Sequence, residues 1–142
     1  MQSSAQSQTV APAGRDAHGT ADGAGAWIAT CPRSALDGAE ARGFEPRHRF
    51  AVIVLECAGE VRAYRDLCPH YGKTRLAWKR DAYMTGDNAR ILCSAHGAEF
   101  DPITGDCVVG ACLGQRLASV PVRLTDDDIV ELWVPAAPSL TL

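Results

Sequence analysis

Two short segments of the sequence combine a cysteine with a histidine. They are Cys68-Pro69-His70 and Cys93-Ser94-Ala95-His96, and a glycine follows each of them, Gly72 or Gly97. The chain has four histidines and six cysteines, so the pairing of half the histidines with a cysteine is a signal and not a result of abundance. Thiolates and neutral imidazoles are both metal ligands. The two segments therefore predict a metal site built from Cys68, His70, Cys93 and His96.

The order of these ligands distinguishes between kinds of metal site. In an extended segment, side chains i and i+2 point to the same side, so Cys68 and His70 can face one centre, whereas the Cys93 segment needs a turn. A structural zinc site commonly takes two cysteines from one knuckle and two histidines from another. Here each segment supplies one of each, which suits two metal ions that each receive ligands from both segments. A zinc-stabilised binding module without a redox role stays open as an alternative.

Short strands separated by turns must position these segments. The clearest predicted strand covers residues 49–56, which are rich in β-branched and aromatic side chains, and a turn at residues 58–60 leads to a partner strand at 61–65. Further strands are predicted at 27–30, 89–93, 120–124 and 129–134, with one helical turn between Pro32 and Phe44. In the absence of a long amphipathic helix, this pattern predicts a small all-β sandwich or barrel.

Length and composition limit the classes of function. The 142 residues allow one domain, and a net charge of −3 provides no basic field for binding nucleic acid. The longest apolar run, residues 50–55, is far shorter than the roughly 20 residues that cross a membrane. Residues 1–26 are dominated by small and polar side chains, which predicts a flexible tail. Because this segment lacks the features of a secretory signal, we expect a cytoplasmic protein.

At the two ligand segments the sequence resembles the Rieske 2Fe-2S ferredoxin-like family. The first segment is similar to that family's Cys-Pro-His-x-Gly motif, and residues 91–101 are similar to its second motif. Thr104-Gly105, Gly110-Ala111-Cys112-Leu113-Gly114 and Val120-Pro121-Val122 then follow the family's usual order, so the resemblance extends over residues 27–134. It implies stacked antiparallel sheets, with an inserted cluster-binding loop subdomain at about residues 66–114 of a domain spanning 27–142.

The resemblance also implies the ligands of a Rieske-type 2Fe-2S cluster. Cys68 and Cys93 would hold the buried iron, and His70 and His96 would hold the outer iron. Gly72 and Gly97 permit a positive φ, which lets backbone N–H groups turn toward the cluster sulfurs. Hydrogen bonds of this kind stabilise the added electron and raise the reduction potential.

The sequence departs from the family in its spacer and in its hydrogen-bond donors. Twenty-two residues separate His70 from Cys93, more than in most ferredoxin members, although a group with longer spacers is similar. High-potential members place Ser and Tyr hydroxyls against the cluster and a cysteine ligand, where this chain has Ala98 and Phe100. We therefore expect a potential in the lower part of the Rieske range of roughly −150 to +300 mV.

The resemblance implies an iron-sulfur electron-transfer protein, a ferredoxin that passes one electron between a reductase and an oxygenase or another acceptor. A dedicated subunit of a multicomponent oxidoreductase is the alternative, and we expect no catalytic activity from the chain alone. Residues 62–90 hold seven Lys or Arg against three Asp, which predicts a basic patch for an acidic redox partner. Of the other cysteines, Cys31 and Cys57 are predicted to be structural, and a disulfide between Cys107 and Cys112 stays open.

Overall fold

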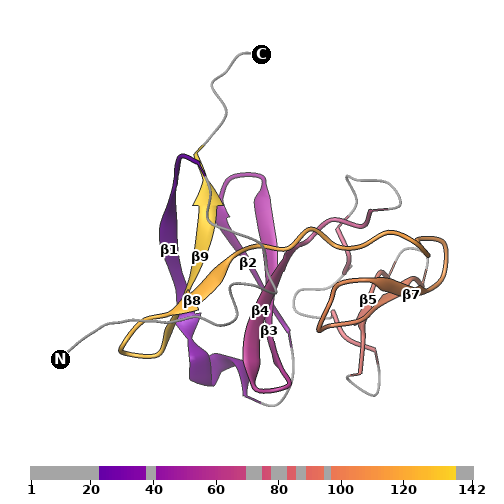
Figure 1. The fold of residues 1–142 in the computed structure, drawn as a ribbon, viewed down its shortest axis with the longest axis horizontal. Helices are drawn as coiled ribbons and strands as arrows, with labels where there is room; N and C mark the ends of the chain where they lie inside the picture. Colours follow the sequence, from indigo (N-terminus) through magenta and orange to yellow (C-terminus); the bar gives the residue numbers. More distant parts are fainter. Residues whose placement is uncertain are drawn as a thin grey trace.

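Three antiparallel sheets of three strands each make up the described part of the chain (Figure 1). The computed structural model describes residues 23–37, 41–69, 75–77, 83–85, 89–94 and 97–136. One sheet joins β1 (Gly25–Pro32), β9 (Ile129–Pro135) and β8 (Val122–Leu124); the next joins β2 (Arg42–Arg47), β3 (Phe50–Cys57) and β4 (Glu60–Arg65); the smallest joins β5 (Ile91–Leu92), β6 (Glu99–Phe100) and β7 (Cys107–Val109). A four-residue 3-10 helix, η2 (Arg33–Leu36), follows β1. The predicted all-β fold is confirmed.

The β2-β3-β4 sheet lies in the middle, with the β1-β9-β8 sheet on one side and the small sheet on the other (Figure 1). Its central strand explains this order, because successive side chains of a strand point to opposite faces. Val52 and Val54 belong to one group of buried residues, the sandwich core, together with residues of β8 and β9 such as Leu132. Ile53 and Leu55 belong to a second group, the ligand-side core, which contains Cys68 and Cys93. The apolar run of β3 is uninterrupted because both of its faces are buried.

Most of the predicted strands are present. The predictions for residues 27–30, 49–56, 61–65 and 129–134 correspond to β1, β3, β4 and β9. The strands predicted at 89–93 and 120–124 are shorter, and the predicted helical turn is η2, which starts directly after Pro32. The sequence analysis missed β2, β6 and β7. The residues of β2 are half-buried or exposed without alternation, and its pairing with β3 is irregular around Pro46. Proline is tolerated in such an edge strand because the strand does not need every ladder hydrogen bond.

After the small sheet, the chain runs back along β4, and its hydrogen bonds there join the small sheet to the rest of the molecule. Residues 118–120 run beside β4, where the Arg65 N–H donates to the Ala118 carbonyl at 2.8 Å and the Val120 N–H donates to Ala63 at 2.9 Å. From the same strand, the Tyr64 hydroxyl donates to the Pro102 carbonyl at 2.9 Å. Burial raises the pKa of Tyr64 above its usual range, so the phenol keeps its donating proton. The small sheet is thereby fixed against the middle sheet.

The ends of the chain fall mostly outside the described residues. Of the predicted tail, residues 1–22 are not described, and β1 begins at Gly25, two residues before the predicted start of the domain. In the described ranges, no helix has the length and apolar character that crossing a membrane requires.

Candidate metal centre

Cys68 and Cys93 both belong to the ligand-side core. Cys68 lies three residues beyond the end of β4, and Cys93 directly follows β5. Their exposed fractions are 1% and 0%, and neither cysteine is part of a disulfide. Burial among apolar side chains keeps water away from the two sulfurs, and sulfur is the donor that iron-sulfur clusters use. The pair therefore fits the predicted role of holding a buried iron.

A closed turn shapes the second ligand segment. The Cys93 N–H donates to the Ala98 carbonyl at 2.8 Å, and the Gly97 N–H donates to the Cys93 carbonyl at 2.8 Å. Gly97 has a φ of +74°, which confirms the positive φ predicted for it. A Cβ at this position would meet no atom within 4 Å. The turn therefore requires glycine for its backbone conformation and not for lack of space.

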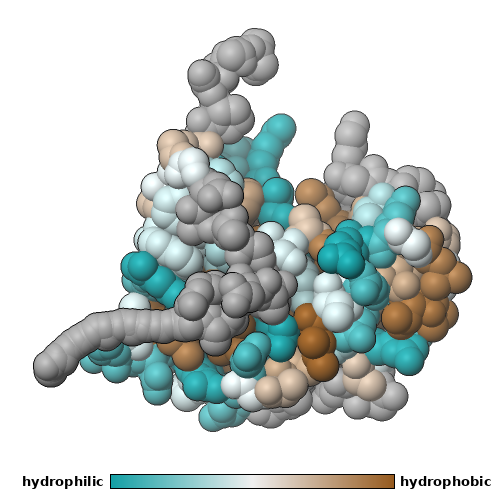
Figure 2. All heavy atoms as spheres, viewed as in Figure 1, coloured by the Kyte–Doolittle hydropathy of each residue, from teal (hydrophilic) through white to brown (hydrophobic). Residues whose placement is uncertain are grey.

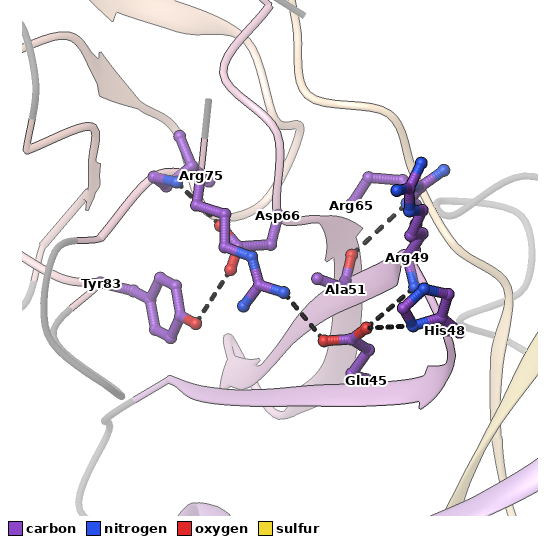
Figure 3. Close-up of polar contacts among 9 residues, drawn as sticks. Glu45, His48, Arg49, Ala51, Arg65, Asp66, Arg75 and Tyr83 are labelled. Carbon is purple, nitrogen blue, oxygen red and sulfur yellow. Dashed lines mark hydrogen bonds and ion pairs between the residues drawn. The ribbon is translucent and has the colours of Figure 1, made fainter. Parts of the chain in front are cut away.

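A buried carboxylate ties the spacer to both cysteine segments. Asp66, 1% exposed, accepts the Leu76 N–H at 2.8 Å and the Tyr83 hydroxyl at 3.0 Å (Figure 3). The Leu76 carbonyl in turn accepts the Ser94 N–H at 2.6 Å. The backbone of Leu76 therefore connects the residue two positions before Cys68 with the residue directly after Cys93. Sequence analysis missed Asp66, although an acidic residue directly after a buried strand and close to a ligand was an available signal.

Arg75 of the spacer also forms an ion pair with Glu45 of β2 at 2.9 Å (Figure 3). The Arg49 N–H and Arg75 lower the pKa of the Glu45 carboxyl, so this partner stays charged. Arg62 and Arg90 pair with Glu60 and Glu99 at 2.8 and 3.3 Å. All three glutamates lie outside residues 62–90, so the predicted basic patch carries less charge than its sequence count suggests. Of its other members, Arg65 lies over the Phe50 ring at 4.0 Å, and Lys73, Lys79 and Arg80 lie outside the described residues.

The predicted imidazole ligands, His70 and His96, lie outside the described residues, as does Gly72. Within the part of the chain that the structure does describe, no three His, Cys, Asp or Glu side chains are grouped so that they could hold a metal ion. A cluster with two cysteine and two histidine ligands needs two thiolates and two imidazoles. The two buried thiols, with the histidines that follow them in the sequence, supply these donor types.

The remaining cysteines divide between the two cores. Cys31 lies in the sandwich core, where burial raises the pKa of its thiol, and Cys57 is half-buried at the end of β3. Cys107 and Cys112 are free thiols and are not joined to each other. The Cys107 Sγ donates to the Val109 carbonyl at 3.3 Å, whereas the Cys112 Sγ lies 3.7 Å from the Cys68 Sγ. The disulfide that the sequence left open is not formed.

An apolar surface marks the end of the molecule that carries the small sheet. Figure 2 shows this surface at the right of the view, on the side where Figure 1 places β7. The large apolar side chains that are exposed in the described residues all belong to this end: Ile103, Val108, Val109 and Leu113. They lie within ten residues of Cys107 or Cys112, in the same part of the chain as the ligand-side core.

Comparisons with known proteins agree with this arrangement. The family model described as the Rieske [2Fe-2S] domain matches residues 26–123. Among solved structures, the Sphingomonas yanoikuyae B1 ferredoxin is 24% identical with a TM-score of 0.61, and the match covers 78% of this chain and 100% of that one. The ferredoxin of carbazole 1,9a-dioxygenase from Nocardioides aromaticivorans IC177 is 19% identical with a TM-score of 0.57, covering 80% and 99%.

A larger protein shares the fold as one of its parts. The terminal oxygenase of carbazole 1,9a-dioxygenase from the same organism is 18% identical with a TM-score of 0.63, and the match covers 89% of this chain but 35% of the oxygenase. No curated protein matches the sequence. At these identities the structural likeness establishes a common fold.

Proposed function

Because the chain belongs to the Rieske [2Fe-2S] domain family, whose cofactor is a Rieske-type 2Fe-2S cluster, we propose that it carries single electrons from a reductase to an oxygenase or another acceptor. The observation that carries this proposal is the pair of buried thiols, Cys68 and Cys93, in one core at the start of the two ligand segments. A match over nearly the full length of two ferredoxins supports a small carrier.

The proposed ligands of the cluster are Cys68 and Cys93 for the buried iron and His70 and His96 for the outer iron. When bound, the cluster supplies a site that accepts and releases one electron. The chain's own residues hold that site in place: the turn closed at Gly97 shapes the second segment, and the Asp66–Leu76–Ser94 connection fixes the two segments relative to each other. We propose that residues 66–114 form the cluster-binding part of the domain at 27–142.

An oxygenase is the favoured acceptor. Solved structures similar to this chain include a complex of reduced oxygenase and oxidised ferredoxin in carbazole 1,9a-dioxygenase. The exposed apolar side chains near β7, such as Val109 and Leu113, supply contact area on the part of this chain that would hold the cluster. An apolar surface suits a partner protein that removes it from water only while the electron is passed. A partner that co-purifies stably with the chain would instead indicate a dedicated subunit.

Metal and sulfide analysis tests the proposal. Protein purified without oxygen is expected to contain about two irons and two acid-labile sulfides per chain. After reduction with dithionite, its electron paramagnetic resonance spectrum should have an average g below that of all-cysteine clusters. One zinc and no sulfide, persisting after cluster reconstitution, would overturn the electron-carrier proposal in favour of the zinc-stabilised module.

Histidine variants test the ligand assignment. His70→Ala and His96→Ala should each lose the spectrum of mixed ligation, because a missing imidazole leaves the outer iron without a ligand. His48→Ala is the matched control, since the His48 side chain is 85% exposed and its Nδ1 lies 4.0 Å from the Glu45 carboxylate. Retention of the native spectrum in both ligand variants would show that the outer ligands lie elsewhere in the chain.

A further inference from the structure

Cys112 is the one buried residue in an otherwise exposed loop. Every other residue from Val108 to Arg116 is exposed, whereas Cys112 is 1% exposed. The loop passes directly over the second ligand segment. Gly110 has a φ of +102°, and a Cβ at this position would lie 2.9 Å from the Ala98 Cα. The Leu113 N–H then donates to Gly110 at 3.4 Å and the Gln115 N–H donates to Cys112 at 2.8 Å. These turns accompany the inward placement of the Cys112 side chain.

The Cys112 thiol lies against the sulfur of a proposed cluster ligand. Its Sγ is 3.7 Å from the Cys68 Sγ, and as long as both groups are thiols either sulfur can be the donor. A cysteine that binds iron has given up its proton. Once Cys68 holds iron, its sulfur can only accept, so a hydrogen bond between the two sulfurs needs Cys112 as its donor.

We propose that Cys112 is a positioning residue for the cluster, whose S–H donates a hydrogen bond to the Cys68 sulfur and raises the reduction potential. The proposal rests on the proposed ligand role of Cys68. A hydrogen bond to a ligand sulfur draws negative charge away from the cluster, and this stabilises the reduced form more than the oxidised form. The thiol is a weak donor, but the contact is buried, and a hydrogen bond is electrostatically stronger in a protein interior than in water.

Two side chains of the second ligand segment do not offer an alternative donor. Ala98 and Phe100 of the second ligand segment are both fully buried, and neither side chain can donate a hydrogen bond. Cys107, the other thiol of this subdomain, donates to the Val109 carbonyl. Of the side chains named here, only that of Cys112, 44 residues from Cys68 along the chain, contacts the Cys68 sulfur as a possible donor.

Redox titration of the cluster-loaded full chain tests the proposal. Cys112→Ala should keep the native iron and sulfide content and show a lower reduction potential than the native protein. Cys107→Ala is the matched control, because it removes the same atom from a buried position in the same subdomain, and its potential should equal the native one. Equal potentials for Cys112→Ala, Cys107→Ala and the native protein would overturn the proposal.

A second pair of variants tests the proposal even if Cys112→Ala takes up the cluster poorly. Cys112→Ser and Cys112→Val fill the position with and without a donor. A higher potential for the serine variant supports the proposal, and equal potentials overturn it. The native protein separates the two levels of inference: absence of iron and sulfide there contradicts the electron-carrier function itself, whereas a loaded cluster whose potential does not respond to Cys112 contradicts only the role of this thiol.

Discussion

At the scale of single residues, Asp66 connects the segments that carry Cys68 and Cys93. A carboxylate that is removed from water is unfavourable unless donors surround it. Asp66 has two, the Leu76 N–H and the Tyr83 hydroxyl, and through Leu76 it reaches the second ligand segment. The position of Cys68 relative to Cys93 is therefore expected to depend on a side chain that is not among the proposed ligands.

Asp66→Ala is expected to weaken both the fold and cluster retention. The substitution removes the carboxylate that accepts from the Leu76 N–H and the Tyr83 hydroxyl, and the loss of an acceptor for a buried donor costs about 1–3 kcal/mol. Tyr83→Phe is the control, because it removes only one of the two bonds and should lower the free energy of unfolding by about 0.5–1.5 kcal/mol. Urea unfolding gives the free energies, and release of iron to a chelator gives retention. An Asp66→Ala variant no less stable than Tyr83→Phe would contradict this role.

At the scale of elements, the loop that follows β7 depends on the close approach of Gly110 to Ala98. Both Gly110 and Gly114 have a positive φ, +102° and +89°, yet only a Cβ at Gly110 would meet neighbouring atoms. Substitution of the two glycines therefore separates the cost of a left-handed backbone from the cost of a steric clash.

Gly110→Ala should be more damaging than Gly114→Ala. Left-handed backbone costs a non-glycine residue about 1–2 kcal/mol in either variant. At Gly110 the added methyl group also pushes the loop away from Ala98, so we expect a further loss of stability and faster cluster loss. Thermal unfolding and iron-release rates of the two loaded variants measure the difference. Identical behaviour would mean that the loop can move aside without consequence.

The sequence predicted those elements whose signals are local. β3 and β4 are continuous runs of strand-forming residues around a turn, and the ligand segments carry their own spacing. β2 was missed because Gly43, Pro46 and its arginines give no alternating pattern, and β6 has only two residues. The Asp66–Leu76 and Cys68–Cys112 contacts join residues that are 10 and 44 positions apart. Such pairings depend on how the chain folds back, which no local pattern records.

At the scale of the whole molecule, the two cores lie on opposite faces of the middle sheet. Leu55 of β3 belongs to the ligand-side core, and Leu132 of β9 belongs to the sandwich core. Both side chains are almost fully buried, at 2% and 0% exposure. The same truncation can therefore be made in each core, one beside the proposed ligands and one away from them.

Leu55→Ala and Leu132→Ala should each lower the free energy of unfolding by about 2–5 kcal/mol. Only Leu55→Ala is expected to speed iron release from the folded protein, because its cavity opens in the core that contains Cys68 and Cys93. Iron release measured well below each variant's unfolding transition separates this effect from global unfolding. Equal release rates in the two variants would show that the cores are not independent in their effect on the cluster.

Because both faces of β3 are buried, the strand also limits which substitutions the protein can accept over evolutionary time. Residues 51–55 are five consecutive buried positions, whereas β9 alternates buried and half-exposed side chains up to Val134. A polar side chain can enter β9 at every second position and face water, but in β3 it would enter one core or the other. Sequences that diverge from this one are therefore expected to vary on alternate positions of β9 while keeping an unbroken apolar stretch at residues 51–55.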